Sequence, residues 1–280
     1  MINLLRADLY RLFRSKSFYV CTMILIAIIV VSGIMIKYVE KTNGDKRSDG
    51  SITVEVENPN PDQVLVKSGT EFALSAPADM KIVGLLVAIT ITIFIATEFN
   101  ERTMKCIIAK GFTRRRIYLS KVITLSIATI IMLATFIVLS FLTGYVVSGR
   151  ASSIGSEYTF EAIRYLAVAF LLYLAISSIF ILVNFIFKNM AVAMAVNISG
   201  LIFIPDILGG IEMHFGIPLT KYSVIHLISG IENLSVSTGK IVEAVLVGCV
   251  YIVVSVVIGV FLFRRAGADN ANSVPLLTST

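Results

Sequence analysis

The sequence contains no tryptophan, only two histidines and only three cysteines. The cysteines, Cys21, Cys106 and Cys249, are odd in number and stand in unrelated surroundings, so they neither form a disulfide framework nor match the spacing of metal ligands. The sequence also lacks a G-x-x-x-x-G-K-[ST] pattern and an H-E-x-x-H pattern. ATP binding by a P-loop within this chain and a zinc-protease site are therefore excluded, and we expect no metal site.

Charge is scarce as well. Charged residues make up 15% of the chain and hydrophobic residues 56%, whereas a soluble domain carries about 25% charged residues. The net charge of +6 is compatible with a nucleic-acid partner. However, most basic residues lie in short loops beside apolar runs, which is where membrane topology signals lie. The composition indicates a polytopic membrane protein, and we expect no nucleic-acid partner.

Apolar stretches long enough to cross a bilayer recur along the chain. A hydrocarbon core of about 30 Å requires a helix of about 20 predominantly apolar residues. The expected spans are 18–36, 80–99, 122–148, 165–187, 190–208 and 241–263. The predicted fold class is therefore an all-α polytopic membrane protein with six transmembrane helices.

The basic residues predict the orientation of these spans. If both termini are inside, most of the 24 lysine and arginine residues fall on the cytoplasmic side, together with few of the 18 acidic residues. The positive-inside rule favours this N-in/C-in arrangement. No charged residue lies in the middle of a predicted span, which disfavours a self-sufficient secondary transporter, because proton- and ion-coupled pumps usually need such a group.

Residues 2–16 are predicted to form an amphipathic helix before the first span. One stripe of this helix carries four apolar side chains, those of Ile2, Leu5, Leu9 and Leu12. A helix with this pattern lies in the membrane interface with its basic side toward the lipid headgroups. We therefore expect an interfacial helix that leads into the first span.

Three other segments complete the predicted architecture. The outer loop 37–81 alternates apolar and polar residues around two prolines, which predicts a small extracellular hairpin. Residues 205–238 are too apolar for a solvated loop and too broken by glycine and proline for a span, so we expect a re-entrant outer segment buried in protein. The tail 266–280 is small and polar and is expected to be flexible and cytoplasmic.

The polar interruption EFNERTMKCIIAKGFTRRRIYLSK, residues 98–121, organises the rest of the chain. Met104, Ile107 and Ile108 have the spacing of a narrow apolar stripe on a helix within 98–112. Gly111 suits the left-handed residue that ends such a helix.

A second helix is expected directly after this glycine. Thr113 can cap it, and Arg114, Arg115 and Arg116 then occupy its first turn. There the arginines oppose the helix macrodipole, so local helix stability does not explain them. Lipid phosphates, the positive-inside rule and a protein partner are the remaining explanations.

Asn184 and Asn197 are the clearest polar residues at membrane depth. We predict that they form hydrogen bonds between helices. Contact with substrate along a translocation path is the alternative for both residues. His214 and His226 fall in the outer segment, where they are expected to be interfacial polar groups rather than metal ligands or proton carriers.

With this topology the chain resembles the permease subunits of ABC-2 type ABC transporters, particularly the small bacterial permeases of peptide-export and antimicrobial-peptide-resistance systems. The resemblance covers nearly the whole chain. It rests on the opening INLLRADLYRLFRSKSFY, on the 98–121 motif and on six spans with a re-entrant-looking segment before the last. It implies that residues 2–16 are the elbow helix and that 98–112 is the coupling helix that docks on the ATPase. Many relatives carry a glycine where this chain has Arg102.

The resemblance further implies a non-catalytic subunit of an ATP-driven exporter in the bacterial plasma membrane. Two copies of a partner ATPase would bind ATP and Mg, this chain would bind no cofactor, and a second permease chain would complete the unit, with a homodimer favoured. The implied contact residues are Glu98, Glu101, Arg102, Lys105, Ile108 and Phe112, with Arg114, Arg115 and Arg116 divided between the partner and lipid phosphate.

The apolar spans favour amphipathic or membrane-active peptides, or other hydrophobic compounds, as the cargo. Two alternatives come from other classes of protein. One is a membrane immunity or sensor protein that captures a peptide through its outer loop without transporting it. The other is a drug or ion exporter.

Overall fold

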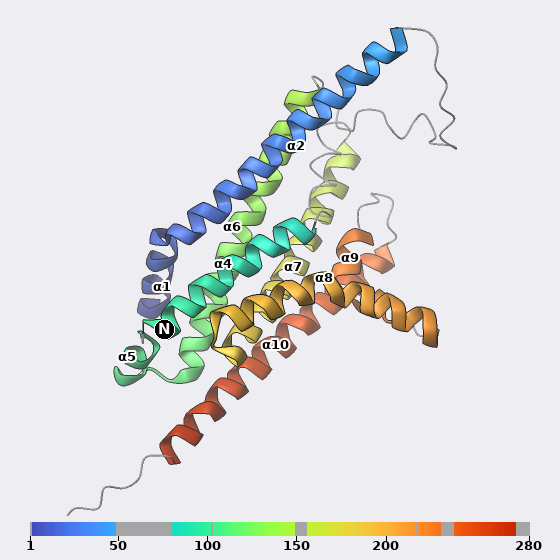
Figure 1. The fold of residues 1–280 in the computed structure, drawn as a ribbon. Helices are drawn as coiled ribbons and strands as arrows, with labels where there is room; N and C mark the ends of the chain where they lie inside the picture. The colour runs from blue at the N-terminus through green and yellow to red at the C-terminus, as the bar shows by residue number, and fades with distance from the viewer. Residues whose placement is uncertain are drawn as a thin grey trace, which may run out of the picture.

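The computed structural model describes residues 2–48, 80–101, 103–148, 156–216, 218–230 and 238–272. These residues are helical almost throughout, and none of them lies in a β-strand. Long helices run side by side in a tilted bundle (Figure 1). The predicted all-α class is confirmed.

The described helices follow the predicted order closely. They are α1 (Ile2–Arg14), α2 (Lys16–Ser48), α4 (Met80–Asn100), α5 (Thr103–Ala109), α6 (Arg114–Ser148), α7 (Ser156–Phe187), α8 (Met190–Phe215), the 3₁₀ helix η3 (Thr220–Tyr222), α9 (Val224–Gly230) and α10 (Thr238–Asn272). Six of them, α2, α4, α6, α7, α8 and α10, are long and apolar enough to cross a membrane. The predicted six membrane-spanning helices are therefore confirmed.

Helix α6 begins earlier than the predicted third span. It includes Arg114 and runs for 35 residues, which corresponds to about 52 Å of helix. A hydrocarbon core of about 30 Å cannot cover this length. At least one end of α6 therefore extends beyond the apolar layer.

Helix α8 is longer than the predicted fifth span, 190–208. Helix α8 continues through Pro205 to Phe215, and Gly216 then ends it with φ 68°, donating its N–H to the carbonyl of Glu212. A proline is tolerated in membrane helices because neighbouring groups satisfy the freed carbonyl. The short elements expected in the outer segment appear only afterwards, as η3 and α9, while residues 231–237 lie outside the described residues.

Two other boundaries differ from the prediction. Helix α10 continues to Asn272, so the first residues of the predicted flexible tail are helical, and 273–280 lie outside the described residues. Helix α2 continues to Ser48, into the predicted outer loop. The predicted hairpin falls within 49–79, also outside the described residues.

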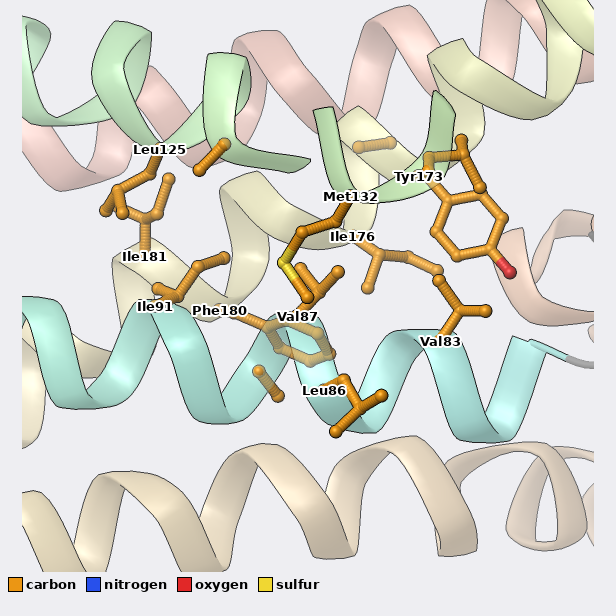
Figure 2. Packing of buried hydrophobic residues seen from close by; sticks show 14 of the residues in the cluster. Val83, Leu86, Val87, Ile91, Leu125, Met132, Tyr173, Ile176, Phe180 and Ile181 are labelled. Carbon is orange, nitrogen blue, oxygen red and sulfur yellow. The ribbon is translucent and has the colours of Figure 1, made fainter. Parts of the chain in front are cut away.

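Helices α4 and α7 form the centre of the bundle. The spans of α4 and α7 are 67% and 56% buried, whereas those of α8 and α10 are each 17% buried. Side chains from α4, α6 and α7 meet in one apolar layer (Figure 2), which includes Val83, Leu86, Val87, Ile91, Leu125, Met132, Tyr173, Ile176, Phe180 and Ile181. The outer faces of α8 and α10 carry exposed apolar side chains, as expected of helices that face lipid or a second membrane chain.

Helices α1 and α5, the turn between α7 and α8 and the last turns of α10 lie at the same end of the bundle (Figure 1). We call this the basic end, because exposed basic side chains gather on it, namely Arg6, Arg14, Lys110, Arg115, Arg116 and Lys188. Asn189 shapes the turn, since its side chain accepts a hydrogen bond from the N–H of Ala191 at 2.9 Å and caps α8.

Candidate functional site

Helix α1 packs against α6 at the basic end. Its buried residues are Leu4, Asp8 and Leu12, which repeat every fourth position and therefore share one face. Of the predicted apolar stripe, Leu12 belongs to this face, whereas Ile2 is 80% exposed. The sequence did not predict this buried face, which has an acidic residue, Asp8, at its centre.

Asp8 is buried because it has charged and polar partners on α6. The ammonium of Lys121 contacts the Asp8 carboxylate, and the Ser120 hydroxyl donates a hydrogen bond to the other Asp8 oxygen at 2.7 Å. The same ammonium contacts the Glu98 carboxylate at the end of α4. The Lys121 and Glu98 side chains are both completely buried. A single lysine thus joins three helices through two carboxylates.

Arg11 extends this cluster toward the surface. One of its guanidinium nitrogens lies 3.3 Å from Glu98, and the other lies 2.7 Å from the exposed Glu101. Asp8 and Glu98 together carry one more negative charge than Lys121 neutralises, and Arg11 supplies the compensating positive charge. Buried charges are retained in proteins when they are paired in this way. We refer to Asp8, Arg11, Glu98 and Lys121 as the charged junction.

A cluster of aromatic rings joins four helices at the basic end. The ring of Phe185 packs edge-to-face with those of Phe99, Tyr118 and Phe263, at centroid distances of 5.8, 4.8 and 5.1 Å. These rings come from α7, α4, α6 and α10 respectively. The Arg114 guanidinium lies 5.4 Å from the Phe263 ring centroid. Edge-to-face pairs and a cation over a ring both stabilise such contacts.

Helix α5 contacts the end of α4 at the basic end. Met104 is buried, and Ile107 and Ile108 pack against the core, so the predicted apolar stripe is confirmed. Gly111 has φ 84° and donates its N–H to the carbonyl of Ile108 at 2.9 Å, which confirms its predicted role in ending the helix. The opposite side of α5 exposes Cys106, Ala109 and Lys110.

The predicted contact residues differ in how exposed they are. Glu101, Arg115 and Arg116 are exposed at the basic end, and Arg114 is half-buried. Ile108 and Phe112 are half-buried against the chain's own core. Arg102 and the side chain of Lys105 lie outside the described residues.

Glu98 is placed differently from the other predicted contact residues. Its side chain is fully buried inside the chain and contacts Lys121. This placement corrects the expectation that Glu98 meets a partner directly, because a buried carboxylate offers no surface to a second protein. Glu98 instead anchors the loop that carries α5.

Sequence reasoning missed three members of the charged junction. Asp8 was counted only among the cytoplasmic acids, and Arg11 and Lys121 only among the cytoplasmic bases. The signal for Asp8 was available, because Leu4 and Leu12 flank it at four-residue spacing on a helix. Nothing in the local pattern pairs Asp8 with Lys121, since the two residues are 113 positions apart.

Asn184 and Asn197 come together on a single hydroxyl. Each side-chain amide donates a hydrogen bond to the Thr92 oxygen, at 3.2 and 3.1 Å, and all three side chains are buried. Asn184 also donates to the carbonyl of Phe180 at 2.8 Å. The cluster links α4, α7 and α8 in the manner of the interhelical hydrogen bonds expected from the sequence.

No group of three or more His, Cys, Asp or Glu residues able to hold a metal ion occurs in the part of the chain that the structure describes. His214 packs edge-to-face against its neighbour Phe215 at 4.9 Å between ring centroids. Six apolar helices long enough to cross a membrane, together with the short helix α5 packed against their core, define a multi-pass membrane protein with a candidate coupling element.

The comparisons with known proteins identify the family. A model of the ABC-2 family transporter protein matches residues 2–268. The chain therefore belongs to the ABC-2 family, and the resemblance inferred from the sequence is confirmed. A comparison with curated proteins finds no match for this chain.

Proposed function

We propose that this chain is the non-catalytic permease subunit of an ATP-driven exporter and that α5 is its coupling helix. Membership of the ABC-2 family implies association with an ABC ATPase partner. The proposal rests on the position of α5 and on which of its sides is exposed. Helix α5 lies at the basic end, with its apolar stripe on the core and its other side exposed.

The exposed side of α5 suits a protein cleft. Cys106 and Ala109 are small, so a partner backbone can approach the helix closely, and Lys110 adds a charge that a carboxylate can pair with. Glu101 flanks this surface on one side, and Arg115 and Arg116 flank it on the other. We refer to these six residues as the docking face. Lipid phosphates can share Arg115 and Arg116, since both side chains are exposed at the start of a membrane helix.

The remainder of the assembly follows from this role. Two ATPase subunits bind ATP and Mg below the membrane, and the basic end faces the cytoplasm of a bacterial cell. A second permease, in a homodimer, completes the transmembrane unit. The exposed apolar faces of α8 and α10 support this arrangement because they have no partner helix within the part of the chain that the structure describes.

We further propose that the cargo is an amphipathic or membrane-active peptide, or another hydrophobic compound, and that it moves outward. The apolar helix faces support a cargo that enters from the lipid phase. A role for Asn184 and Asn197 in the path requires the helices around Thr92 to separate during transport, because both amides are buried within one chain.

The native Cys106 offers a direct test of the docking face. In nanodiscs, its reaction with a maleimide is measured with and without a co-expressed candidate ATPase, in a background where Cys249 is replaced by alanine. Cys21 is buried and reacts slowly. We expect strong protection of Cys106 in the complex.

A matched control places a cysteine at the opposite end, as His214→Cys, where the side chain is exposed. Its labelling should not change when the ATPase is added. An ATPase that never binds, or one that binds and leaves Cys106 unprotected, contradicts the proposal and favours a sensor that acts without transport.

A further inference from the structure

We propose that Asp8 and Lys121 are positioning residues that fix α1 to the base of the coupling loop, so that α1 and α5 move as one body. The inference rests on the proposed function only for the source of the movement, which is the partner ATPase. The contact itself belongs to this chain and can be tested without the partner.

The first argument is the geometry of Lys121. Its ammonium contacts carboxylates on two different helices, Asp8 on α1 and Glu98 on α4, while its own backbone belongs to α6. Any movement of one of these helices away from the other two breaks a contact of this ammonium. The three helices therefore keep their relative positions as long as the lysine remains paired.

The second argument concerns the kind of contact. Apolar side chains discriminate weakly between apolar neighbours of similar volume. A buried charge that loses its partner remains unpaired in a medium of low dielectric, which is strongly unfavourable. A buried charge pair therefore fixes one register. Fixing a register is the best-attested role of such pairs in other proteins.

The third argument is that residues of the charged junction precede and follow α5 in the sequence. Glu98 and Glu101 precede α5, and both contact Arg11 of α1. Lys121 follows α5, two turns into α6. Both ends of the coupling loop are thus tied to the same face of α1. A force on α5 reaches α1 through charged contacts on both sides.

A helix that floats independently in the membrane interface would be anchored only by the apolar stripe of Ile2, Leu5 and Leu9. Helix α1 has an additional anchor, because the face that contains Asp8 is buried against α6. Helix α1 is thus anchored to protein through a charge.

The test measures the distance between α1 and α5. Spin labels are placed at Ala7→Cys, an exposed position on α1, and at Thr103→Cys, a half-buried position on α5 outside the docking face, with Cys21, Cys106 and Cys249 replaced by alanine. Asp8→Asn removes one charge from the junction and leaves the pair of Glu98 and Lys121 intact. Asp206→Asn makes the same chemical change at an exposed position on α8 and serves as the matched control.

In nanodiscs without the ATPase, we expect a single narrow distance distribution for the unsubstituted junction and for Asp206→Asn. Asp8→Asn should broaden it severalfold, and Asp8→Glu, which restores the charge, should narrow it again. A distribution for Asp8→Asn that matches the unsubstituted junction overturns the inference, as does an Asp8→Glu distribution as broad as that of Asp8→Asn.

With the ATPase bound, the distance should remain unchanged between the nucleotide-free and ATP-trapped states, whereas in Asp8→Asn it should shift with nucleotide. A nucleotide-dependent shift in the unsubstituted junction overturns the inference. Failure of the ATPase to bind contradicts the proposed function instead, and the measurement without ATPase still decides the role of Asp8.

Discussion

The apolar layer in the middle of the bundle and the Glu98–Lys121 pair of the charged junction are both buried, and they share helices α4 and α6. In the middle, Val87, Ile91 and Met132 meet other apolar side chains (Figure 2). At the basic end, Glu98 and Lys121 meet each other. Helices α4 and α6 are therefore joined by apolar contacts in the middle of the bundle and by a charge pair at the basic end.

The difference matters in a membrane. Lipid tails are as apolar as leucine, so apolar burial alone gives helices little reason to prefer one neighbour over another. The middle of the bundle can accept many apolar sequences of similar volume. The charged junction accepts only substitutions that preserve its charge balance. The specific geometry of this chain therefore depends most on the basic end.

The largest expected effect comes from Lys121→Met, which leaves two carboxylates buried without their ammonium. We expect a loss of about 3–5 kcal/mol in stability, as for other buried pairs that lose one partner. Thermal unfolding in detergent or nanodiscs measures it. Leu125→Met, one turn along the same helix in the apolar layer, should cost less than about 1.5 kcal/mol.

The triple variant Asp8→Asn/Glu98→Gln/Lys121→Met removes Lys121 and both of its carboxylate partners at once. It should recover most of the lost stability, because Arg11 still pairs with Glu101 and no buried charge is left unpaired. A triple variant as unstable as Lys121→Met would contradict this explanation, because the loss of stability would then come from altered packing volume rather than from unpaired charge.

A second prediction concerns the close approach of α10 to α6 at Gly259. An added Cβ there would collide with the buried ring of Tyr118. Gly259→Ala should therefore destabilise the protein by about 1–3 kcal/mol, the usual range for overpacking. Gly209→Ala on α8 is the control, since no neighbouring heavy atom lies within 4 Å of its added Cβ. Equal melting temperatures for the two variants would contradict this packing.

A third prediction concerns the polar cluster between these two regions. Thr92→Val keeps the shape of the side chain but removes the oxygen that accepts hydrogen bonds from both asparagines. Interhelical hydrogen bonds in membranes contribute on average about 0.6 kcal/mol and at most about 1.7 kcal/mol, so we expect a loss in that range. Thr135→Val is the control, because that hydroxyl bonds only to the carbonyl of Ile131 in its own helix.

The smallest effect on stability is expected at the exposed edge of the junction. Glu101 is 62% exposed, and its pair with Arg11 is open to solvent. Glu101→Gln should therefore change stability by at most about 1 kcal/mol, and less at high salt. The same variant should weaken binding of the ATPase, because Glu101 belongs to the docking face. A binding affinity that stays unchanged would remove Glu101 from that face.

The sequence predicted the regions that depend on composition and short-range pattern. Six apolar runs predicted six membrane helices, and the stripe of Met104 and Ile107 followed by Gly111 predicted α5 and its end. These signals come from residues close together in the chain, where helical periodicity and left-handed glycines have known positions.

The sequence could not predict which face of α1 is buried. A carboxylate on an amphipathic helix normally faces water, and only the position of Lys121 in the folded chain reverses this preference. The continuation of α8 beyond residue 208 was missed for a similar reason, since glycine and proline end most helices in water and are tolerated in a membrane bundle. The buried face of α1 depends on packing between residues far apart in the sequence, and the length of α8 depends on its surroundings in the membrane.

The most direct test of the central claim, that the basic end couples this permease to an ATPase, is ATP hydrolysis by the reconstituted complex. The complex is assembled in nanodiscs with a panel of membrane-active peptides, with and without charge reversal of Lys110, Arg115 and Arg116 to glutamate. The account predicts that a peptide raises ATP turnover and that charge reversal abolishes this response while the permease remains folded. An ATPase that never associates, or one whose turnover is the same with the reversed docking face, would contradict it.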